Sequence, residues 1–331
     1  MNLIKQFLSV IYGMLVNLRY FLYNTGILKI HKLPVKIVCV GNITAGGTGK
    51  TPCVLAIVSQ LIDAGKKVVI LTRGYKRKTK GTIIFNNAGS YTIEQAGDEP
   101  YMIKKNLPGI PIIIGKNRYK SGLIAIEKFS PDIILLDDGF QHIQLYRDIN
   151  IVLINCLDPF GKEKLLPSGY LREPAAGLIR ANFIILTHTE KIKDFTLEKI
   201  KEKITSINPH AQIYNGIHQF NKITEFLTDN TVDLDFFKKK TAVTMASIGH
   251  PEAFELTAKN AGLNITKKIR FADHHWYKTR ELIDIFSTND IIITTEKDAI
   301  RIELLKQNID NSLLSRIYVL KIKFVIPEIS L

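Results

Sequence analysis

Short apolar runs alternate with segments of helical periodicity from residue 35 to about residue 190. Several runs are apolar without interruption, which is typical of strands buried on both faces of a parallel sheet. The predicted strands are VKIVCVGN (35–42), KKVVILTR (66–73), GTIIFNN (81–87), IPIIIG (110–115), DIILLDD (132–138), INIVLIN (149–155) and NFIILT (182–187). Helices are predicted over 51–65, with Gly65 as C-cap, and over 117–129. The pattern predicts an α/β fold in which helices cover both faces of a parallel sheet.

A second, smaller set of elements follows a charged helical stretch at 196–208. Its predicted strands are 241–247, 263–271 and 290–295. One predicted helix begins at Pro251, and another covers 278–287. The runs 211–220 and 315–326 bracket this set, so we expect them to pair as a two-stranded connector. The expected organisation is an N-terminal helix (1–28), a core domain (29–215) and a smaller C-terminal α/β domain (216–331).

The first residues form an amphipathic helical pattern. About a dozen uncharged residues run from Phe7 to Leu18, which is fewer than the roughly 20 residues that a membrane-spanning helix needs. A signal peptide is also disfavoured, because Arg19 interrupts the apolar segment and no small-residue cleavage site follows it. Polar or small residues fall on one narrow stripe: Asn2, Gln6, Ser9, Gly13, Asn17 and Asn24. The wide apolar face holds Leu3, Phe7, Ile11, Met14, Leu18 and Phe21. This pattern favours a helix in a membrane interface, with Lys5, Arg19, Lys29 and Lys32 near anionic headgroups; a terminal helix packed on the domain is the alternative.

Composition adds two constraints. The 331 residues are 46% hydrophobic and carry a formal charge of +14, which suggests an anionic partner: nucleic acid, a phosphorylated small molecule or an acidic membrane surface. A Lys-, Ile- and Asn-rich composition can also reflect an AT-rich genome. Cys39, Cys53 and Cys156 are far apart in the sequence, so neither a disulfide framework nor a thiolate zinc site is indicated.

A phosphate-binding loop follows the first predicted strand of the core. Its residues are Thr44, Ala45, Gly46, Gly47, Thr48, Gly49, Lys50 and Thr51. Glycines let backbone N–H groups face a phosphate, Lys reaches the β- and γ-phosphate oxygens, and Ser or Thr reaches Mg²⁺. Thr44 departs from the usual pattern, which has Gly at the first position. A preceding strand and a following helix support a P-loop NTPase-like core.

Two adjacent acids, Asp137 and Asp138, directly follow the apolar run at 132–136. Strand C-termini of a parallel sheet share the edge that carries the phosphate loop, so we expect at least one of these carboxylates to meet Mg²⁺ together with Thr51. No N/T-K-x-D determinant for guanine is present, which argues against a signalling GTPase. A helicase or recombinase would need a DNA-binding surface, and the apolar N-terminal helix argues against one.

Seven ordered motifs make a family resemblance: VGNITAGGTGKTP, TRGY, GDEP, DDGFQH, LLPSGYLREP, FADHH and TEKDAIR. Together with the N-terminal helix they closely resemble the tetraacyldisaccharide 4'-kinase family of Gram-negative bacteria, in which Ser or Thr stands where Thr44 does. The resemblance implies transfer of the ATP γ-phosphate, with Mg²⁺, to the 4'-hydroxyl of an acylated glucosamine disaccharide 1-phosphate. It also implies a peripheral protein on the cytoplasmic face of the inner membrane; we expect a monomer and no nucleic-acid partner.

The resemblance further implies the roles of individual residues. It assigns Asp98 of GDEP as the general base and His274 of FADHH as its partner, in preference to His275; by itself, Asp98 is expected to be a helix N-cap. The adjacent histidines could suggest zinc, but no third ligand stands at a familiar spacing. Residues of the other motifs expected around substrate are Arg73, Tyr75, Gln141, His142, Arg172 and Glu173.

Some assignments stay open. Arg73 and Arg172 fit either phosphate contacts or structural ion pairs, and Arg118 is a further candidate cation. We have no chemical role for TEKDAIR, in which Glu296 and Asp298 could brace the two domains. A membrane-associated P-loop ATPase that switches a protein partner would share the phosphate loop, the acidic turn and the helix. GDEP and FADHH, an acid and a histidine suited to deprotonating an alcohol, favour the kinase.

Overall fold

The computed structural model describes residues 2–75, 77–87, 89–273 and 275–329. His274, the expected partner of the base, lies outside the described residues. Within them, the strands form one continuous path of hydrogen-bonded neighbours in the order β11-β10-β12-β13-β8-β7-β6-β1-β5-β2-β4-β3, with β9 paired to β8. Most neighbours are parallel; the antiparallel pairs among the described residues are β3 with β4, β8 with β13 and β8 with β9. The prediction of a mainly parallel α/β fold is confirmed.

The core domain holds the first seven strands, and each lies inside a predicted run. They are β1 (Lys36–Asn42), β2 (Val68–Thr72), β3 (Ile83–Phe85), β4 (Ile112–Ile114), β5 (Ile133–Asp137), β6 (Ile149–Asn155) and β7 (Phe183–Thr187). Its helices are α2 (Lys50–Asp63), α3 (Ile93–Ala96), α4 (Asp98–Asn106), α5 (Arg118–Phe129) and α6 (Asp194–Ile207), with 3-10 turns η1 (Gly161–Glu163), η2 (Ala175–Arg180) and η3 (Thr189–Lys191).

Strand residues of the core domain alternate between two hydrophobic cores. In β1, Ile37 and Cys39 face the layer of α5 and α6, whereas Val38 and Val40 face the layer of α2 and α4. Burial on both faces explains why these strands are apolar without interruption. One end of α2 corrects the sequence prediction: Ala64 is the C-cap, and Gly65, with a φ of 73°, is the left-handed residue after it.

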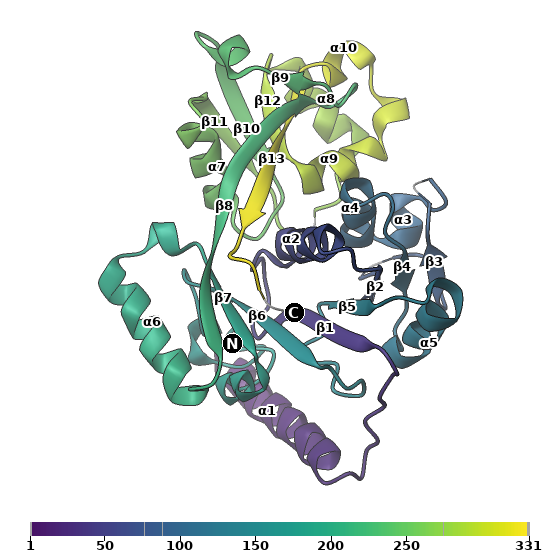
Figure 1. Cartoon of the computed structure of the whole chain (residues 1–331). Coiled ribbons are helices and arrows are strands. Elements are labelled where there is room, and N and C mark those ends of the chain that lie inside the picture. The colour runs from purple at the N-terminus through teal and green to yellow at the C-terminus, as the bar shows by residue number, and fades with distance from the viewer. Residues whose placement is uncertain (1, 76, 88, 274, 330–331) are drawn as a thin grey trace.

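The C-terminal domain is a smaller α/β unit (Figure 1). Its strands are β8 (Gln212–Glu225), β9 (Thr231–Val232), β10 (Thr241–Ala246), β11 (Asn264–Arg270), β12 (Ile292–Thr295) and β13 (Ile317–Val325). Its helices are α7 (Pro251–Asn260), α8 (Thr279–Ser287), α9 (Glu296–Glu303) and α10 (Asn311–Leu314), with 3-10 turns η4 (Leu234–Phe237) and η5 (Lys306–Asn308). Phe254 of α7 packs on one face of this sheet, and Leu282 of α8 packs on the other.

The long strand β8 connects the two domains, as the bracketing runs predict. Residues 212–216 of β8 pair in parallel with β7 of the core domain, and residues 217–225 pair antiparallel with β13. In Figure 1, β8 runs from the upper lobe down to β7, and β13 lies along the upper part of β8. The two sets of strands are therefore joined by hydrogen-bonded backbone.

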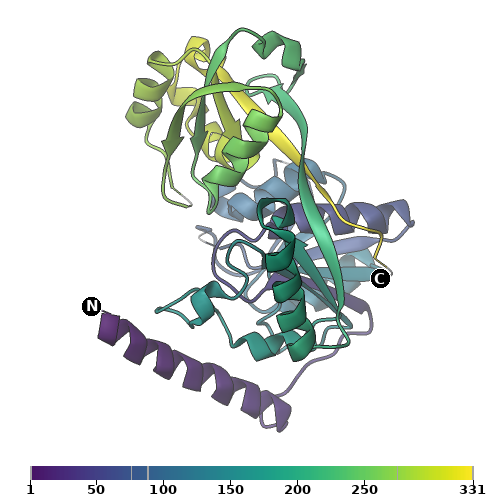
Figure 2. The ribbon, with the colours of Figure 1, turned by 90° about the vertical axis from the view of Figure 1, so that its left-hand side faces the viewer.

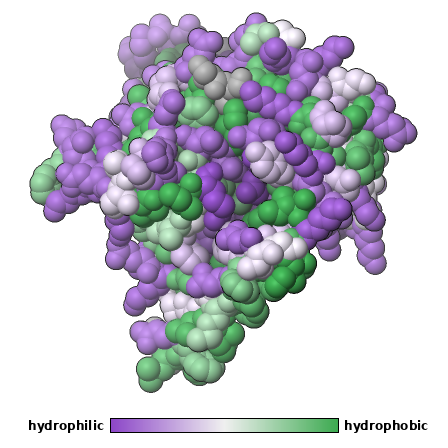
Figure 3. Space-filling view, turned by 60° about the horizontal axis from the view of Figure 1, so that its bottom comes forward, coloured by the Kyte–Doolittle hydropathy of each residue, from purple (hydrophilic) through white to green (hydrophobic). Residues whose placement is uncertain are grey.

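The N-terminal helix α1 (Asn2–Asn24) lies at the bottom of the molecule, and Figure 2 shows its N-terminal end projecting from the body. Two residues of the narrow polar stripe pack on the protein: Ser9 Oγ donates to the Leu165 carbonyl at 2.8 Å, and Gly13 is buried beside the same leucine. The other described residues of the stripe, Gln6, Asn17 and Asn24, are exposed. The apolar face points outward, with Leu3 80% exposed. Figure 3 shows hydrophobic residues gathered over this lower part. No helix among the described residues is long and apolar enough to cross a membrane.

Candidate active site

The phosphate loop leaves β1 and enters α2 with the backbone expected of its glycines. Gly46 and Gly49 have φ angles of 112° and 83°, a region that residues with a Cβ rarely adopt. Gly49 precedes Lys50, the first residue of α2, and no side chain caps this helix end. The free N–H groups at this end and the positive end of the helix dipole are suited to an anion.

Polar contacts from neighbouring segments pin the loop. Asn42 Nδ2 donates to the Thr44 carbonyl at 2.8 Å and to Thr48 Oγ1 at 2.9 Å, and the Ala45 N–H donates to the Tyr170 carbonyl at 2.7 Å. Thr44 itself forms a β-bridge with Leu171. Because Thr44 is not among the described residues with positive φ, its position requires no glycine, which accounts for the departure from the usual loop pattern.

The acidic turn reaches the loop because β5 lies beside β1. A Cβ at Gly41 of β1 would stand 2.6 Å from Phe140 Cβ, so only glycine lets the turn approach this closely. Asp137 ends β5 and is buried, and its Oδ2 accepts a hydrogen bond from Thr72 Oγ1 at 2.8 Å. Asp138 has a φ of 50°, a left-handed conformation that Asp tolerates better than most residues. This conformation turns its carboxylate toward the loop.

Two cations hold Asp138. Arg172 Nη1 lies 3.0 Å from both of its carboxylate oxygens, and Lys50 Nζ lies 3.7 Å from Oδ1. Burial acts to raise the pKa of Asp138, but Lys50 and Arg172 outweigh it and bring that pKa below its ordinary value. Burial raises the pKa of Asp137, and the negative charges of Glu99 and Asp138 raise it further.

The acidic turn suits a hard cation. Asp137, Asp138 and Thr51 line one cavity and offer the carboxylate and hydroxyl oxygens that Mg²⁺ prefers. A cation would also relieve the repulsion among the carboxylates that raises the pKa of Asp137. Among the described residues, no cluster of three or more His, Cys, Asp or Glu side chains has metal-binding geometry.

The cavity has a volume of about 920 Å³ and lies between the two domains. Its lining includes the phosphate loop from residue 45 to 51, whereas Thr44, the first residue of the loop, is buried and is not part of the lining. Five of the residues expected around substrate also line it: Arg73, Tyr75, Gln141, His142 and Arg172. Arg73 and Tyr75 are exposed at its rim. Burial, reinforced by Arg118 and Arg147, lowers the pKa of His142 to about 4, so this imidazole is neutral at physiological pH.

Glu173 differs from its expected role. It is fully buried and is not among the described residues that line the cavity. Its carboxylate accepts from Gln141 Nε2 at 2.7 Å and Arg180 Nη2 at 2.6 Å, and also from the Tyr20 hydroxyl of α1. We correct the expectation of substrate contact: Glu173 ties α1 to the turn that carries Gln141.

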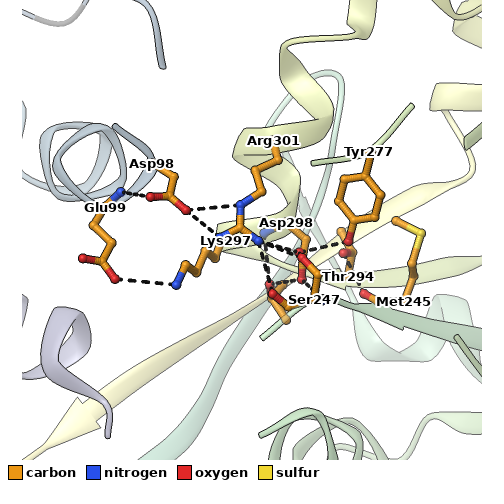
Figure 4. A network of polar contacts seen from close by, with 10 residues as sticks. Asp98, Glu99, Met245, Ser247, Tyr277, Thr294, Lys297, Asp298 and Arg301 are labelled. Atoms are coloured by element: carbon orange, nitrogen blue, oxygen red, sulfur yellow. Dashed lines mark hydrogen bonds and ion pairs between the residues drawn. The ribbon is translucent and has the colours of Figure 1, made fainter. Parts of the chain in front are cut away.

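Asp98 is held from the C-terminal domain (Figure 4). It is the first residue of α4, and Gly97 is the N-cap, so the predicted N-cap role of Asp98 is wrong by one position. Its Oδ2 accepts from Arg301 Nη2 at 2.5 Å and Nε at 3.2 Å, and its Oδ1 accepts from the Glu99 N–H at 3.0 Å. Glu99 lines the cavity, whereas Asp98 is only 6% exposed behind it.

His275 has a role of its own. Its Nε2 lies 2.9 Å from Glu281 Oε2 at the start of α8, and its ring stacks on Phe271. The structure therefore uses His275 to fix the segment that precedes α8.

Sequence reasoning missed several cavity residues. Tyr12 and Arg19 of α1 line the cavity, although we expected Arg19 at lipid headgroups. Three histidines beside the phosphate loop were also missed: His188, His218 and His250. Arg118, the further candidate cation, lines the cavity and donates to the Gly115 carbonyl at 3.0 Å. The histidines stand alone in the sequence, so only the fold brings them together.

Comparisons with known proteins agree with this geometry. The model of the family described as tetraacyldisaccharide-1-P 4'-kinase matches residues 1–330. A tetraacyldisaccharide 4'-kinase of Halothermothrix orenii is 35% identical over 97% of this chain and 88% of its own, and one of Aquifex aeolicus is 38% identical over 89% and 88%.

A solved structure is similar as well. The crystal structure of the "apo" form of LpxK from Aquifex aeolicus in complex with ATP superposes with a TM-score of 0.75 at 34% identity, covering 96% of this chain and 93% of that one. Sequence, fold and the arrangement of the phosphate loop and acidic turn thus point the same way. The chain belongs to the tetraacyldisaccharide-1-P 4'-kinase family and is an ATP-dependent kinase.

Proposed function

We propose that this protein works at a membrane surface and transfers the γ-phosphate of ATP to the 4'-hydroxyl of a tetraacylated glucosamine disaccharide 1-phosphate. One observation carries the proposal: the cavity with the phosphate loop and the acidic turn is also lined by Tyr12 and Arg19 of α1, whose apolar face points outward. A lipid whose acyl chains stay in the membrane could present its sugar to a cavity at that position.

Membrane contact is supported by the exposure of α1. Phe7 and Met14 are 66% and 65% exposed, and a row of such side chains on one helix is unusual in water. Lys5, Lys29 and Lys32 are exposed on or just after this helix, where each could gain roughly 1 kcal/mol from an anionic surface. The proposed site is the cytoplasmic face of the inner membrane of a Gram-negative bacterium, with peripheral attachment by α1. We propose that the protein acts as a monomer.

The proposed chemistry relies on positioning and charge. Lys50 and the loop N–H groups would hold the nucleotide phosphates, and Arg172 would meet charge that develops on the transferred group. Thr51 with Asp137 and Asp138 would hold Mg²⁺, which neutralises phosphate charge when bound. Asp98 would accept the proton of the 4'-hydroxyl, and Arg73, Tyr75 and Gln141 would orient the sugar and its phosphate. General-base assistance of this kind is worth about 10²-fold to 10⁴-fold.

Radiolabel transfer tests the proposal. The protein is incubated with γ-labelled ATP, Mg²⁺, detergent and a tetraacyldisaccharide 1-phosphate, beside the Lys50→Ala variant. We expect labelled lipid from the wild type only, since Lys50 is the cation of the loop. Label released only as inorganic phosphate would contradict the proposal and favour an ATPase that switches a protein partner.

A further inference from the structure

The TEKDAIR motif, left without a role by the sequence, surrounds a buried cation. Arg301 is 1% exposed, although a guanidinium is among the most costly groups to bury. Asp298 and Arg301 are three residues apart on α9, so both project from one face of the helix. Figure 4 shows the guanidinium between Asp298, in its own domain, and Asp98 of α4.

The C-terminal domain fixes one side of this guanidinium. Nη1 of Arg301 donates to Ser247 Oγ at 2.7 Å and to the Ser247 carbonyl at 3.2 Å, and it lies 3.4 Å from Asp298 Oδ1. Asp298 is held in turn by the Ser247 N–H at 3.0 Å and the Tyr277 hydroxyl at 3.0 Å. A guanidinium held this way has a single orientation, because its planar fork is rigid.

The other side of the fork crosses to the core domain. Nη2 and Nε both donate to Oδ2 of Asp98, which occupies the two lone-pair sites of that oxygen. The remaining carboxylate oxygen, Oδ1, accepts from the Glu99 N–H at the first turn of α4. Arg301 therefore fixes the rotation of the Asp98 carboxylate.

We propose that Arg301 is the positioning residue for the base: from the C-terminal domain it orients the carboxylate of Asp98, which takes the proton of the acceptor hydroxyl. The inference rests on the proposed function, in which Asp98 is that base. In the step, the hydroxyl O–H bond breaks and its proton passes to the carboxylate of Asp98. The hydroxyl oxygen forms a bond to the γ-phosphorus, and the bond from that phosphorus to the β–γ bridging oxygen breaks, so that ADP leaves.

The electrostatics favour the same role. Arg301 is paired with both Asp98 and Asp298, and Glu99, the residue after Asp98, has Lys297 Nζ 3.6 Å from its Oε1. A neighbouring guanidinium favours the ionised form of a carboxylate, which is the form that can accept a proton. Loss of Arg301 should therefore move the acid limb of the pH–rate profile to higher pH.

The test compares Arg301→Lys and Arg301→Met with the wild type. Lysine keeps the charge but has no fork. We expect kcat to fall about 10²-fold in Arg301→Met, less in Arg301→Lys, with KM for ATP changed less than about threefold. The acid limb should shift in Arg301→Met and be restored in Arg301→Lys. If Arg301→Met does not fold, the kcat of Arg301→Lys decides the question. That kcat is measured at a temperature well below the melting temperature of the variant, so that the protein is folded.

A double-mutant cycle and a matched control complete the design. In the Asp98→Asn background the base is gone, so Arg301→Lys should cause no further loss of the residual kcat. The matched control is Glu303→Gln. It breaks an exposed ion pair of 3.7 Å between Glu303 of α9 and Lys105 of α4, the two helices that Arg301 and Asp98 also join. Its kcat and pH–rate profile should equal those of the wild type.

Two results would overturn the inference. A folded Arg301→Lys variant with wild-type kcat would show that Asp98 needs no positioning by the fork. A kcat above wild type would mean that the ion pair withholds Asp98 from the reaction. Failure of the wild type to label any lipid would instead reject the proposed function, so the two failures are distinguishable.

Discussion

Replacing Phe7, Met14 and Phe21 by serine removes large apolar side chains from the outward face of α1. These side chains are 66%, 65% and 58% exposed, so most of their surface is in water unless a membrane covers it. Full burial of such a side chain contributes about 1.5–3 kcal/mol, so docking of these partly exposed ones is worth roughly 1–2 kcal/mol each. The triple variant should lose roughly 3–6 kcal/mol of membrane affinity, about 10²-fold to 10⁴-fold in partitioning.

Sedimentation with vesicles of phosphatidylethanolamine and phosphatidylglycerol measures this partitioning across a range of lipid concentrations. The melting temperature should stay within a few degrees of wild type, because α1 packs on the body through its other face, where Ser9 and Gly13 lie. Phe195→Ser is the matched control: it removes an exposed aromatic side chain from a different helix, α6, and should leave partitioning unchanged.

The same variant should phosphorylate a detergent-dissolved acceptor with nearly wild-type kcat, while its KM for a vesicle-embedded acceptor rises. An unchanged bound fraction for the triple variant, with the fold intact, would refute the reasoning that α1 is the membrane contact. A triple variant that unfolds would show that the outward face stabilises the protein itself.

Three further predictions concern stability and the metal. Burial lowers the pKa of His188 to about 3 and of His218 to about 4, so only the unfolded state takes up these protons as the pH falls below about 6.5. The free energy of unfolding should therefore drop by at most about 2 kcal/mol per histidine by pH 5. Thermal melts should show a smaller drop for His188→Gln than for wild type. Gly41→Ala places a Cβ 2.6 Å from Phe140 Cβ and should lower the free energy of unfolding in urea by about 1–3 kcal/mol. In the control Gly109→Ala, the new Cβ has no neighbour within 4 Å, so its free energy of unfolding should stay within about 0.5 kcal/mol of wild type. Equal free energies of unfolding for the two variants would contradict the packing argument. Chelation by EDTA should stop phosphate transfer without changing the circular dichroism spectrum, because the ion pairs of Asp138 hold the acidic turn without a metal. Added Mg²⁺ should restore transfer. Activity that survives chelation would argue against the metal role.

Much of the fold was predictable because its elements carry strong local signals. The strands of the core domain are continuous apolar runs, and the loop between β1 and α2 has glycines where the backbone needs them. The pairing of β8 with β13 was predictable from two long runs that bracket one domain. Helix ends were less certain: the N-cap of α4 and the C-cap of α2 each lie one residue from the predicted position, because Gly97 and Gly65 set the turns.

The site was predictable only where its residues sit in motifs. The phosphate loop, Asp137 and Asp138 come together because parallel strands end at one edge of the sheet. Glu173 was misassigned, since no sequence pattern reveals that Tyr20, Gln141 and Arg180 converge on a buried carboxylate. The contact between Asp98 and Arg301 joins residues 203 positions apart, so only the packing of α4 on α9 could reveal it.

The position of the new phosphate on the lipid product tests the central claim most directly. After reaction with ATP and Mg²⁺, two-dimensional proton–phosphorus NMR of the purified lipid identifies the carbon that carries each phosphate. We predict a new phosphorus signal correlated with the proton on C4' of the distal glucosamine, beside an unchanged 1-phosphate. A new phosphate at any other position, or an unmodified lipid with inorganic phosphate released, would contradict the account.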